Sequence, residues 1–354
     1  MKTFRIALLP GDGIGPEVMR EGVKVLGVVE QRFEQVRFEL EEFSAGAGEY
    51  LRSGDPLPAA TLDRLRDFDA ILLGAMGLPE VRRPSGTEIA PQLDLREQLE
   101  LYAGHRPVRL YHAQDTPLKG YRAGEIDFVI VRESTEGLFW SRKRDVAADA
   151  LEVTDTMRIS RAASERLFRY AFALARKRRR RLTLVDKANV LPSMAFFRKI
   201  FDEMARQFPE VETERIYVDA ASLYLIRRPH TFDVIVTENI FGDILSDLAA
   251  ALVGGMGMAP SGDIGCRHAV FQPAHGSAPD IAGQGKANPT AMVLSVAMML
   301  EWLAHPETVV GAERIRAAVE RCFRDPANRT PDLGGRLATW ELGDILANEV
   351  ARAA

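Results

Sequence analysis

The sequence has little of several features that would place it in a particular class of protein. It contains only two cysteines, Cys266 and Cys322, which excludes a disulfide framework and a cluster of thiolate metal ligands. It has no apolar run long enough to span a bilayer, and its first apolar segment breaks too early to resemble a signal peptide. We therefore predict a cytoplasmic protein with no membrane partner.

A strong charge of one sign is also missing. The formal net charge is −4, which gives no general attraction to nucleic acid or to anionic lipid. A basic run, RKRRRR at 176–181, follows a helix predicted over 159–175, and cations are favoured at that end of a helix. We interpret the run as a solvated helix end and predict no nucleic-acid partner.

The dinucleotide-binding fingerprint G-x-G-x-x-G is absent too. The first predicted strand, 3–9, runs into Gly11, Gly13 and Gly15, which are spaced as G-x-G-x-G, and no acidic strand end follows at the usual distance. Taken alone, these glycines are a weak cofactor signal and fit a tight turn between a strand and a helix better.

The sequence does contain an alternation of strand and helix patterns along its 354 residues, with 46% apolar residues to build a core. Short apolar runs such as 70–73, 126–133 and 182–185 predict buried strands, and segments with helical spacing follow them. This order predicts an α/β fold with mixed sheets covered by helices.

The stretch 232–261 carries two acidic residues at a position suited to function. A buried strand at 234–236 leads through a polar turn into a helix predicted over 241–253, where Asp243 and Asp247 share one face. Two such carboxylates could hold a hard divalent cation, or they could complement the dipole of the first helical turn. This stretch leaves both interpretations open.

Three arginines stand at or near the ends of predicted elements. Arg96 lies in a helix predicted over 93–102, Arg106 lies in the following strand, and Arg132 ends the strand 126–133. They could clamp substrate carboxylates through bidentate hydrogen bonds. For any one of them alone, a surface arginine that covers apolar neighbours is the better interpretation.

Other ionisable residues follow further strands. Lys187 could act as a base if burial lowers its pKa, or it could form an ion pair with Asp186, and Asp219 stands at the end of a strand predicted over 211–217. A long loop of small residues, 271–289, can wrap a ligand with its backbone amides. Its His275 is either a metal ligand or a hydrogen-bonded loop histidine.

Five stretches together resemble a known family. They are LPGDGIGPEV (9–18), VDKANVLP (185–192), VDAAS (218–222), NIFGDILSD (239–247) and HGSAPDIAGQGKANP (275–289). They are similar to the metal-dependent β-decarboxylating dehydrogenases, which include the 3-isopropylmalate, isocitrate, homoisocitrate and tartrate/D-malate dehydrogenases. The resemblance covers nearly the whole chain, and its last two motifs together are very specific.

The resemblance implies a subunit with two α/β domains, one of them discontinuous. Residues 1–100 and 255–354 would form the large, cofactor-binding domain, and 101–254 the small domain for dimerisation, metal and substrate. It also implies a homodimer with shared active sites. The implied activity is the NAD-dependent oxidative decarboxylation of a D-malate-type 2-hydroxy acid with Mg²⁺ or Mn²⁺.

Residue roles follow from the same resemblance. Asp243 and Asp247 would bind the metal together with Asp219 of the partner subunit, and Lys187 of the partner subunit would take the hydroxyl proton. Arg96, Arg106 and Arg132 would hold the substrate carboxylates. The loop would bind the adenosine half of the cofactor through His275, Gly276, Ser277, Ala278, Asp280 and Asn288. Asp280 would pair with ribose hydroxyls and repel a 2′-phosphate, which favours NAD over NADP.

The chain departs from the family pattern at two places. Phe139 stands where the family has a tyrosine, and a phenyl ring cannot protonate the enolate that decarboxylation leaves. Gln92 and Leu93 stand where a leucine-pathway enzyme would have two leucines, so Gln92 suggests a smaller or more polar substituent than isopropyl. Phe139 also favours an alternative, a non-catalytic paralogue that acts as a regulatory subunit, whereas the intact aspartates, arginines and Lys187 oppose it.

Overall fold

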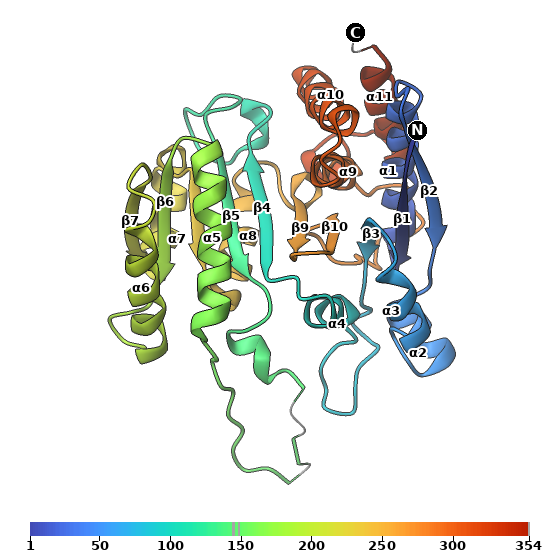
Figure 1. The fold of residues 1–354 in the computed structure, drawn as a ribbon. Helices are drawn as coiled ribbons and strands as arrows, with labels where there is room; N and C mark the ends of the chain where they lie inside the picture. Colours follow the sequence, from blue (N-terminus) through green and yellow to red (C-terminus); the bar gives the residue numbers. More distant parts are fainter. Residues whose placement is uncertain (144–145, 148, 353–354) are drawn as a thin grey trace.

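The computed structural model of the chain describes residues 1–143, 146–147 and 149–352 and has the predicted α/β architecture. All its named strands belong to one mixed sheet, in which neighbours follow the order β2-β1-β3-β10-β9-β4-β5-β8-β6-β7 (Figure 1). The pairs β10–β9, β9–β4 and β4–β5 are antiparallel, and the remaining pairs are parallel. The sheet is therefore mixed, as predicted, but its strands form one continuous sheet and not several.

The strands are short, and the inner ones are almost fully buried, as their apolar sequences predict. The residues of β3, β8, β9 and β10 are buried along their whole length. The strands are β1 Lys2–Gly11, β2 Val36–Glu42, β3 Ala70–Ala75, β4 Ala103–Arg109, β5 Asp127–Glu133, β6 Arg181–Asp186, β7 Glu212–Tyr217, β8 Val234–Thr237, β9 Pro260–Ile264 and β10 Ala269–Pro273.

Helices cover both halves of this sheet. Helices α1, α9, α10 and α11 gather over the half that contains β1, and α5, α6, α7 and α8 surround the half that contains β6 (Figure 1). The helices are α1 Gly15–Glu30, α2 Ala47–Ser53, α3 Ala59–Leu65, α4 Pro91–Gln98, α5 Arg161–Lys177, α6 Pro192–Ala205, α7 Val218–Arg227, α8 Asn239–Ala251, α9 Thr290–Trp302, α10 Pro306–Arg324 and α11 Thr339–Arg352. Among the described residues, none of the helices is long and apolar enough to cross a membrane.

The two halves meet at a narrow junction between β4 and β9. Only Ala103, Gly104 and His105 pair with β9, opposite Ile264, Asp263 and Gly262. Strands from 2–75 and 260–273 lie on one side of this junction, and strands from 103–237 lie on the other. The division into domains at residues 100 and 254 stays a prediction.

Two local expectations need correction. The helix predicted over 93–102 is α4, which begins two residues earlier and ends at Gln98, because Ala103 already belongs to β4. The basic run is more than a solvated helix end: Arg178 Nε and the backbone N–H of Arg179 donate to the buried carboxylate of Asp233, each at 2.8 Å. The run therefore neutralises an acid that directly precedes β8.

Candidate active site

A cavity of about 230 Å³ brings together most of the residues predicted to bind substrate. It opens where α4, β4, β5 and α8 meet the loop after β10. Its lining includes Gln92, Leu93, Arg96, Arg106, Arg132, Phe139, Asp243, His275 and Gly276. We call this cavity the arginine pocket.

Arg132 is fixed at the end of β5 by residues of α8. It is only 1% exposed, and its Nε and Nη2 donate to Oδ1 of Asn239 at 3.0 and 2.6 Å. Its Nη1 forms an ion pair with Asp243. Burial, followed by the charge of Arg96, lowers the pKa of Arg132 to about 10. The side chain therefore stays a cation at neutral pH in spite of its burial.

Arg96 and Arg106 are also buried, on α4 and β4. Arg96 Nε donates to Oδ2 of Asp263 at 3.0 Å, whereas Nε of Arg106 is buried with no hydrogen-bond partner in the described part of the chain. Burial, and then the charge of Arg96, lower the pKa of Arg106. The interpretation of each residue as a surface arginine is wrong for all three, because all three side chains are buried.

The arrangement leaves positive charge and hydrogen-bond donors unused in the arginine pocket. Three arginines line it, and Asp243 is the only carboxylate among the described residues of its lining. Cations held this close repel one another, and an unpaired buried donor is costly. An anion with more than one carboxylate would relieve both, because guanidinium groups bind carboxylates in bidentate fashion.

Asp243 and Asp247 lie one turn apart on α8, as predicted. Asp243 contributes to the arginine pocket, and Asp247 is exposed beside it on the same helix. Partial loss of solvent around its carboxylate, and then the negative charge of Asp243, raise the pKa of Asp247. Two carboxylates that repel each other in this way suit a divalent cation, which would remove the repulsion, so the pair fits a metal.

Asp219 does not join this pair within the chain. No group of three or more histidine, cysteine or acidic side chains in the described ranges is placed to share a metal ion. Asp219, in the first turn of α7, is exposed and accepts a hydrogen bond from Lys187 Nζ at 2.8 Å, which lowers the pKa of Asp219. Lys187 and Asp219 thus form a pair of their own that is not part of the lining of the arginine pocket.

The loop after β10 packs against the glycine turn that follows β1. The backbone N–H of Ile14 donates to the carbonyl of Ser277 at 2.7 Å, and the hydroxyl of Ser277 donates to the carbonyl of Gly77. Gly13 has a φ of +57°, and a Cβ there would lie 2.0 Å from the Ser277 carbonyl oxygen. This glycine is therefore required for the turn and the loop to meet.

His275 and Gly276 carry the loop into the arginine pocket. Nδ1 of His275 lies 2.9 Å from the Gly276 carbonyl, and its Nε2 is buried with no partner in the described residues. Burial lowers the pKa of His275, so the neutral ring keeps an acceptor available for a ligand. This orphaned nitrogen fits a bound cofactor.

The other predicted cofactor residues differ in their surroundings. Asn288 is buried: its Oδ1 accepts from the backbone N–H of Thr290 at 3.0 Å, and its Nδ2 donates to Asp332 at 3.2 Å. Ala278 is half-buried with a φ of +38°, and Asp280 is exposed. Asn288 therefore shapes the entry to α9, while Asp280 is free to meet a ligand from solvent.

The two departures from the family pattern both lie in the arginine pocket. The Phe139 ring centroid lies 5.2 Å from Cζ of Arg132, a cation–π contact. The Oε1 atom of Gln92 is buried with no hydrogen-bond partner among the residues that the structure describes, and Leu93 also lines the pocket. A buried amide oxygen without a hydrogen-bond donor is costly, so a ligand that donates a hydrogen bond to it would bind favourably here.

Residues that orient the arginines were missed in the sequence. Asp263 accepts from Gln272 Nε2 at 2.8 Å as well as from Arg96, and Asn239 donates to the Glu136 carbonyl at 2.9 Å while it accepts from Arg132. Asn239 opens the motif NIFGDILSD, a signal that could have been used. Asp263 lies in β9, whose sequence PSGDI carries no apolar pattern, so its burial could not be predicted locally.

Ion pairs that hold α4 in place were missed as well. Arg142 Nη2 lies 2.9 Å from Oδ1 of Asp94, and Lys143 Nζ lies 2.6 Å from Oε2 of Glu97. Asp94 and Glu97 flank Arg96 on α4, so the segment after β5 is tied to the helix that presents Arg96, Gln92 and Leu93. Nothing in the local sequence pattern indicates a contact over this separation.

Comparison with known proteins gives consistent matches. The family described as isocitrate/isopropylmalate dehydrogenase matches residues 5–346. The chain is 46% identical to a 3-isopropylmalate dehydrogenase of Moorella thermoacetica, over 98% of this chain and 99% of that protein, and 40% identical to one of Aquifex aeolicus, over 99% and 98%. Its structure is similar to that of an isocitrate dehydrogenase from Methylococcus capsulatus, with a TM-score of 0.89, 37% identity and coverage of 99% and 100%.

Proposed function

The chain belongs to the isocitrate/isopropylmalate dehydrogenase family, and we propose that it oxidatively decarboxylates a D-malate-type 2-hydroxy acid with NAD and a divalent metal ion. The observation that carries this proposal is the convergence of Arg96, Arg106 and Arg132 on one pocket beside Asp243. A hydroxy dicarboxylate complements this pocket, because its carboxylates balance the guanidinium charges and use their free donors.

The substrate would be oriented by groups that are already fixed. Asn239 and Asp263 hold the guanidinium groups of Arg132 and Arg96, so these side chains lose little conformational freedom when a carboxylate binds. Arg106, whose Nε has no partner within the described ranges, would bind the remaining carboxylate. A substrate held at both ends presents its C2 carbon in a defined direction.

The metal would be held by Asp243 and Asp247, with Asp219 of the partner subunit as a further ligand. When bound, Mg²⁺ or Mn²⁺ supplies Lewis-acid polarisation of substrate oxygen atoms and lowers the pKa of the hydroxyl. Lys187 of the partner subunit would hold the hydroxyl proton on Nζ. Asp219 orients Lys187 through the hydrogen bond of 2.8 Å.

This assignment requires a homodimer with shared sites, which forms part of the proposal. Helix α7, which begins next to Asp219, exposes Leu223 and Ile226, and α8, which carries Asp243, exposes Ile244. Large apolar side chains exposed on neighbouring helices are typical of a subunit interface. A partner that covers these helices would have its own Lys187 and Asp219 near this interface.

A complementation experiment tests the shared site. Asp219→Asn and Asp243→Asn variants should each lose more than about 10²-fold in Mn²⁺-dependent activity while they keep the fold, since each loses a ligand charge. In a mixed dimer, one site would carry both substitutions and the other would carry neither. Co-expression should therefore restore activity that neither variant has alone. Recovery that does not exceed the sum of the two variants would refute sites shared between subunits.

The cofactor would bind along the loop 275–288 and the glycine turn after β1. His275 offers the acceptor Nε2, and Asp280 offers a carboxylate to ribose hydroxyls while it repels a 2′-phosphate. The kcat/KM should thus be higher with NAD than with NADP. Asp280→Asn should lower the ratio of kcat/KM with NAD to kcat/KM with NADP. Equal or better efficiency with NADP in the unchanged protein would contradict this role of Asp280.

The assay that tests the whole proposal is NAD reduction with Mn²⁺ and each of 3-isopropylmalate, tartrate and D-malate. Turnover with one of them, lost in Asp243→Asn, is the expected result. The alternative is a regulatory paralogue, which Phe139 favours because it has no proton to donate at C3. Binding of these acids without NAD reduction would support that alternative and refute the proposed activity.

A further inference from the structure

A second and larger cavity lies on the opposite face of β4 from the arginine pocket. Its volume is about 520 Å³, which lies in the range of small-molecule sites. Along β4, His105 and Pro107 line this cavity, whereas Arg106 between them lines the arginine pocket, as the alternation of side chains in a strand requires. We call it the rear cavity.

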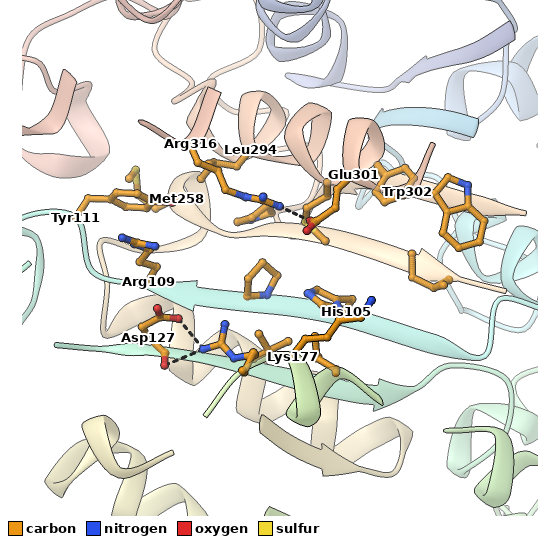
Figure 2. A pocket seen from close by; sticks show the side chains of 18 of the residues that line it. His105, Arg109, Tyr111, Asp127, Lys177, Met258, Leu294, Glu301, Trp302 and Arg316 are labelled. Atoms are coloured by element: carbon orange, nitrogen blue, oxygen red, sulfur yellow. Dashed lines mark hydrogen bonds and ion pairs between the residues drawn. The ribbon is translucent and has the colours of Figure 1, made fainter. Parts of the chain in front are cut away.

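The walls of the rear cavity come from both halves of the molecule. Helices α9 and α10 lie along one side, and β4, β5 and the end of α5 lie along the other (Figure 2). Its apolar surface includes Val129, Met258, Ile264, Phe271, Leu294 and Met298. This surface would accommodate a hydrocarbon chain or ring.

Most charged groups around the rear cavity are already neutralised by a neighbour. Arg178 pairs with Asp127 at 2.8 Å, Arg316 pairs with Glu301 at 2.5 Å, and Arg109 forms an ion pair with Glu320; Figure 2 draws the first two as dashed lines. The contact between Arg109 and Glu320 joins β4 to α10 across the cavity. These pairs leave no free charge for a ligand.

Lys177 is the exception. It is the last residue of α5, it is exposed, and it has no ion pair or hydrogen bond with any residue that the structure describes. His105, on the same side of the cavity in Figure 2, is no counter-ion, because its Nδ1 lies 2.8 Å from the Tyr170 hydroxyl and burial lowers its pKa to about 4. The cavity thus offers apolar walls and one unpaired ammonium group.

We propose that the rear cavity binds an amphipathic monocarboxylate, whose apolar body fills the space between α9 and β4 and whose carboxylate pairs with Lys177. A dicarboxylate would bury a second charge against apolar walls without a partner, which is costly. The two cavities therefore select differently: dicarboxylates bind the arginine pocket, and single carboxylates with apolar bodies bind the rear cavity.

Octanoate is the probe, and isothermal titration calorimetry of the full-length protein is the measurement. Octanoate should bind, and Lys177→Gln should weaken it about tenfold, as expected for the loss of a charge-assisted hydrogen bond. Arg176→Gln is the matched control: it removes the same charge from the same turn of α5, but Arg176 pairs with Glu210 and does not line the cavity. The Arg176→Gln variant should bind octanoate with the same affinity as the unchanged protein.

Two further comparisons define the site and the ligand class. Arg106→Met should bind octanoate normally, because Arg106 faces the other cavity, and acetate should bind more than about tenfold more weakly than octanoate, because it buries fewer methylene groups. The proposal is overturned if octanoate fails to bind, if Lys177→Gln and Arg176→Gln bind it equally, or if Arg106→Met abolishes binding. Equal binding of octylammonium would also overturn it. None of these outcomes depends on the enzymatic activity.

Discussion

Arg329 and Arg106 are both buried arginines, but only Arg329 has its hydrogen bonds satisfied within the chain. Arg329, between α10 and α11, binds both carboxylate oxygens of Asp115, at 2.9 and 3.1 Å, and donates to the carbonyls of Asp325 and Phe323 at 2.6 and 3.1 Å. Arg106 has no such partner, and the pKa of its guanidinium is lowered by burial and by Arg96.

The difference separates a structural role from a functional one. Asp115 precedes β5 and Arg329 follows α10, so their bidentate pair joins the two halves of the molecule and needs nothing else. A guanidinium that is buried without a partner is instead a cost to the fold, and such costs are typical of sites that bind a charged ligand. Burial alone does not distinguish a structural arginine from a functional one, whereas the presence or absence of hydrogen-bond partners does.

The largest effect that this comparison predicts is on stability, at Asp115. Asp115→Asn leaves the Arg329 charge buried without a counter-ion and should lower the free energy of unfolding by about 3–5 kcal/mol, as measured by denaturant titration. The control is Asp344→Asn, which breaks an exposed pair with Lys24 and should change stability by less than about 0.5 kcal/mol. Equal stability of the two variants would contradict the structural role.

The next effect is on activity, at Arg106. Arg106→Met removes a charge that has no partner in the described part of the chain, so stability should stay the same or rise. The kcat/KM should fall by about 10²-fold through loss of a charge-assisted contact with substrate. Arg109→Met is the control on the same strand, since Arg109 lines the rear cavity. A loss of stability like that of Asp115→Asn would mean that Arg106 is structural after all.

A gain in activity is predicted at Phe139, which lies against Arg132 in the arginine pocket. Phe139→Tyr supplies an acidic hydroxyl near this guanidinium, and general acid catalysis is worth about 10²–10⁴-fold on the step that it assists. Turnover should rise, and the unchanged protein should show a pre-steady-state burst of NADH with slower release of decarboxylated product. Stopped-flow absorbance and quenched-flow analysis measure the two. No burst and no gain would mean that another group already protonates C3.

The smallest effect concerns the unpaired amide oxygen of Gln92. An isopropyl group against this amide would leave the amide oxygen without a donor, which costs roughly 1–3 kcal/mol. A substrate with hydrogen or hydroxyl as its substituent avoids this cost. The kcat/KM for tartrate or D-malate should exceed that for 3-isopropylmalate, and Gln92→Leu should shift the ratio toward 3-isopropylmalate by about tenfold or more. A clear preference of the unchanged protein for 3-isopropylmalate would refute this role of Gln92.

Much of the fold could be read from local sequence. The apolar runs predicted β3, β5, β6 and β8 to within a few residues. Helical spacing predicted α8 over 241–253, and the helix begins and ends two residues earlier, at Asn239 and Ala251, shortly before Gly254 and Gly255 take positive φ values of +114° and +90°. The end of α4 was misplaced because 99–102 keep a helical pattern, although Glu100 takes a positive φ of +52° and β4 begins at Ala103. Local periodicity does not indicate this backbone conformation.

The candidate site was predictable only in part. The residue types at Arg96, Arg106 and Arg132 indicated a carboxylate clamp once the family resemblance was recognised, although each one alone favoured a surface position. Their burial and their partners were not predictable, because Asp263 is separated from Arg96 by 167 residues and Asn239 from Arg132 by 107. Such contacts depend on the order of strands in the sheet.

The sequence by itself determined the family, the α/β class, the acidic pair on α8 and the tight glycine turn after β1. These features depend on spacing within one segment, or on motifs that are specific as a set. Only the tertiary structure decided which arginines have a partner, that Lys187 and Asp219 stand apart from the lining of the arginine pocket, and that β4 separates two cavities. The physical reason is that charge balance and cavity shape depend on contacts between strands and helices that are distant in the sequence. A local sequence pattern does not specify such contacts.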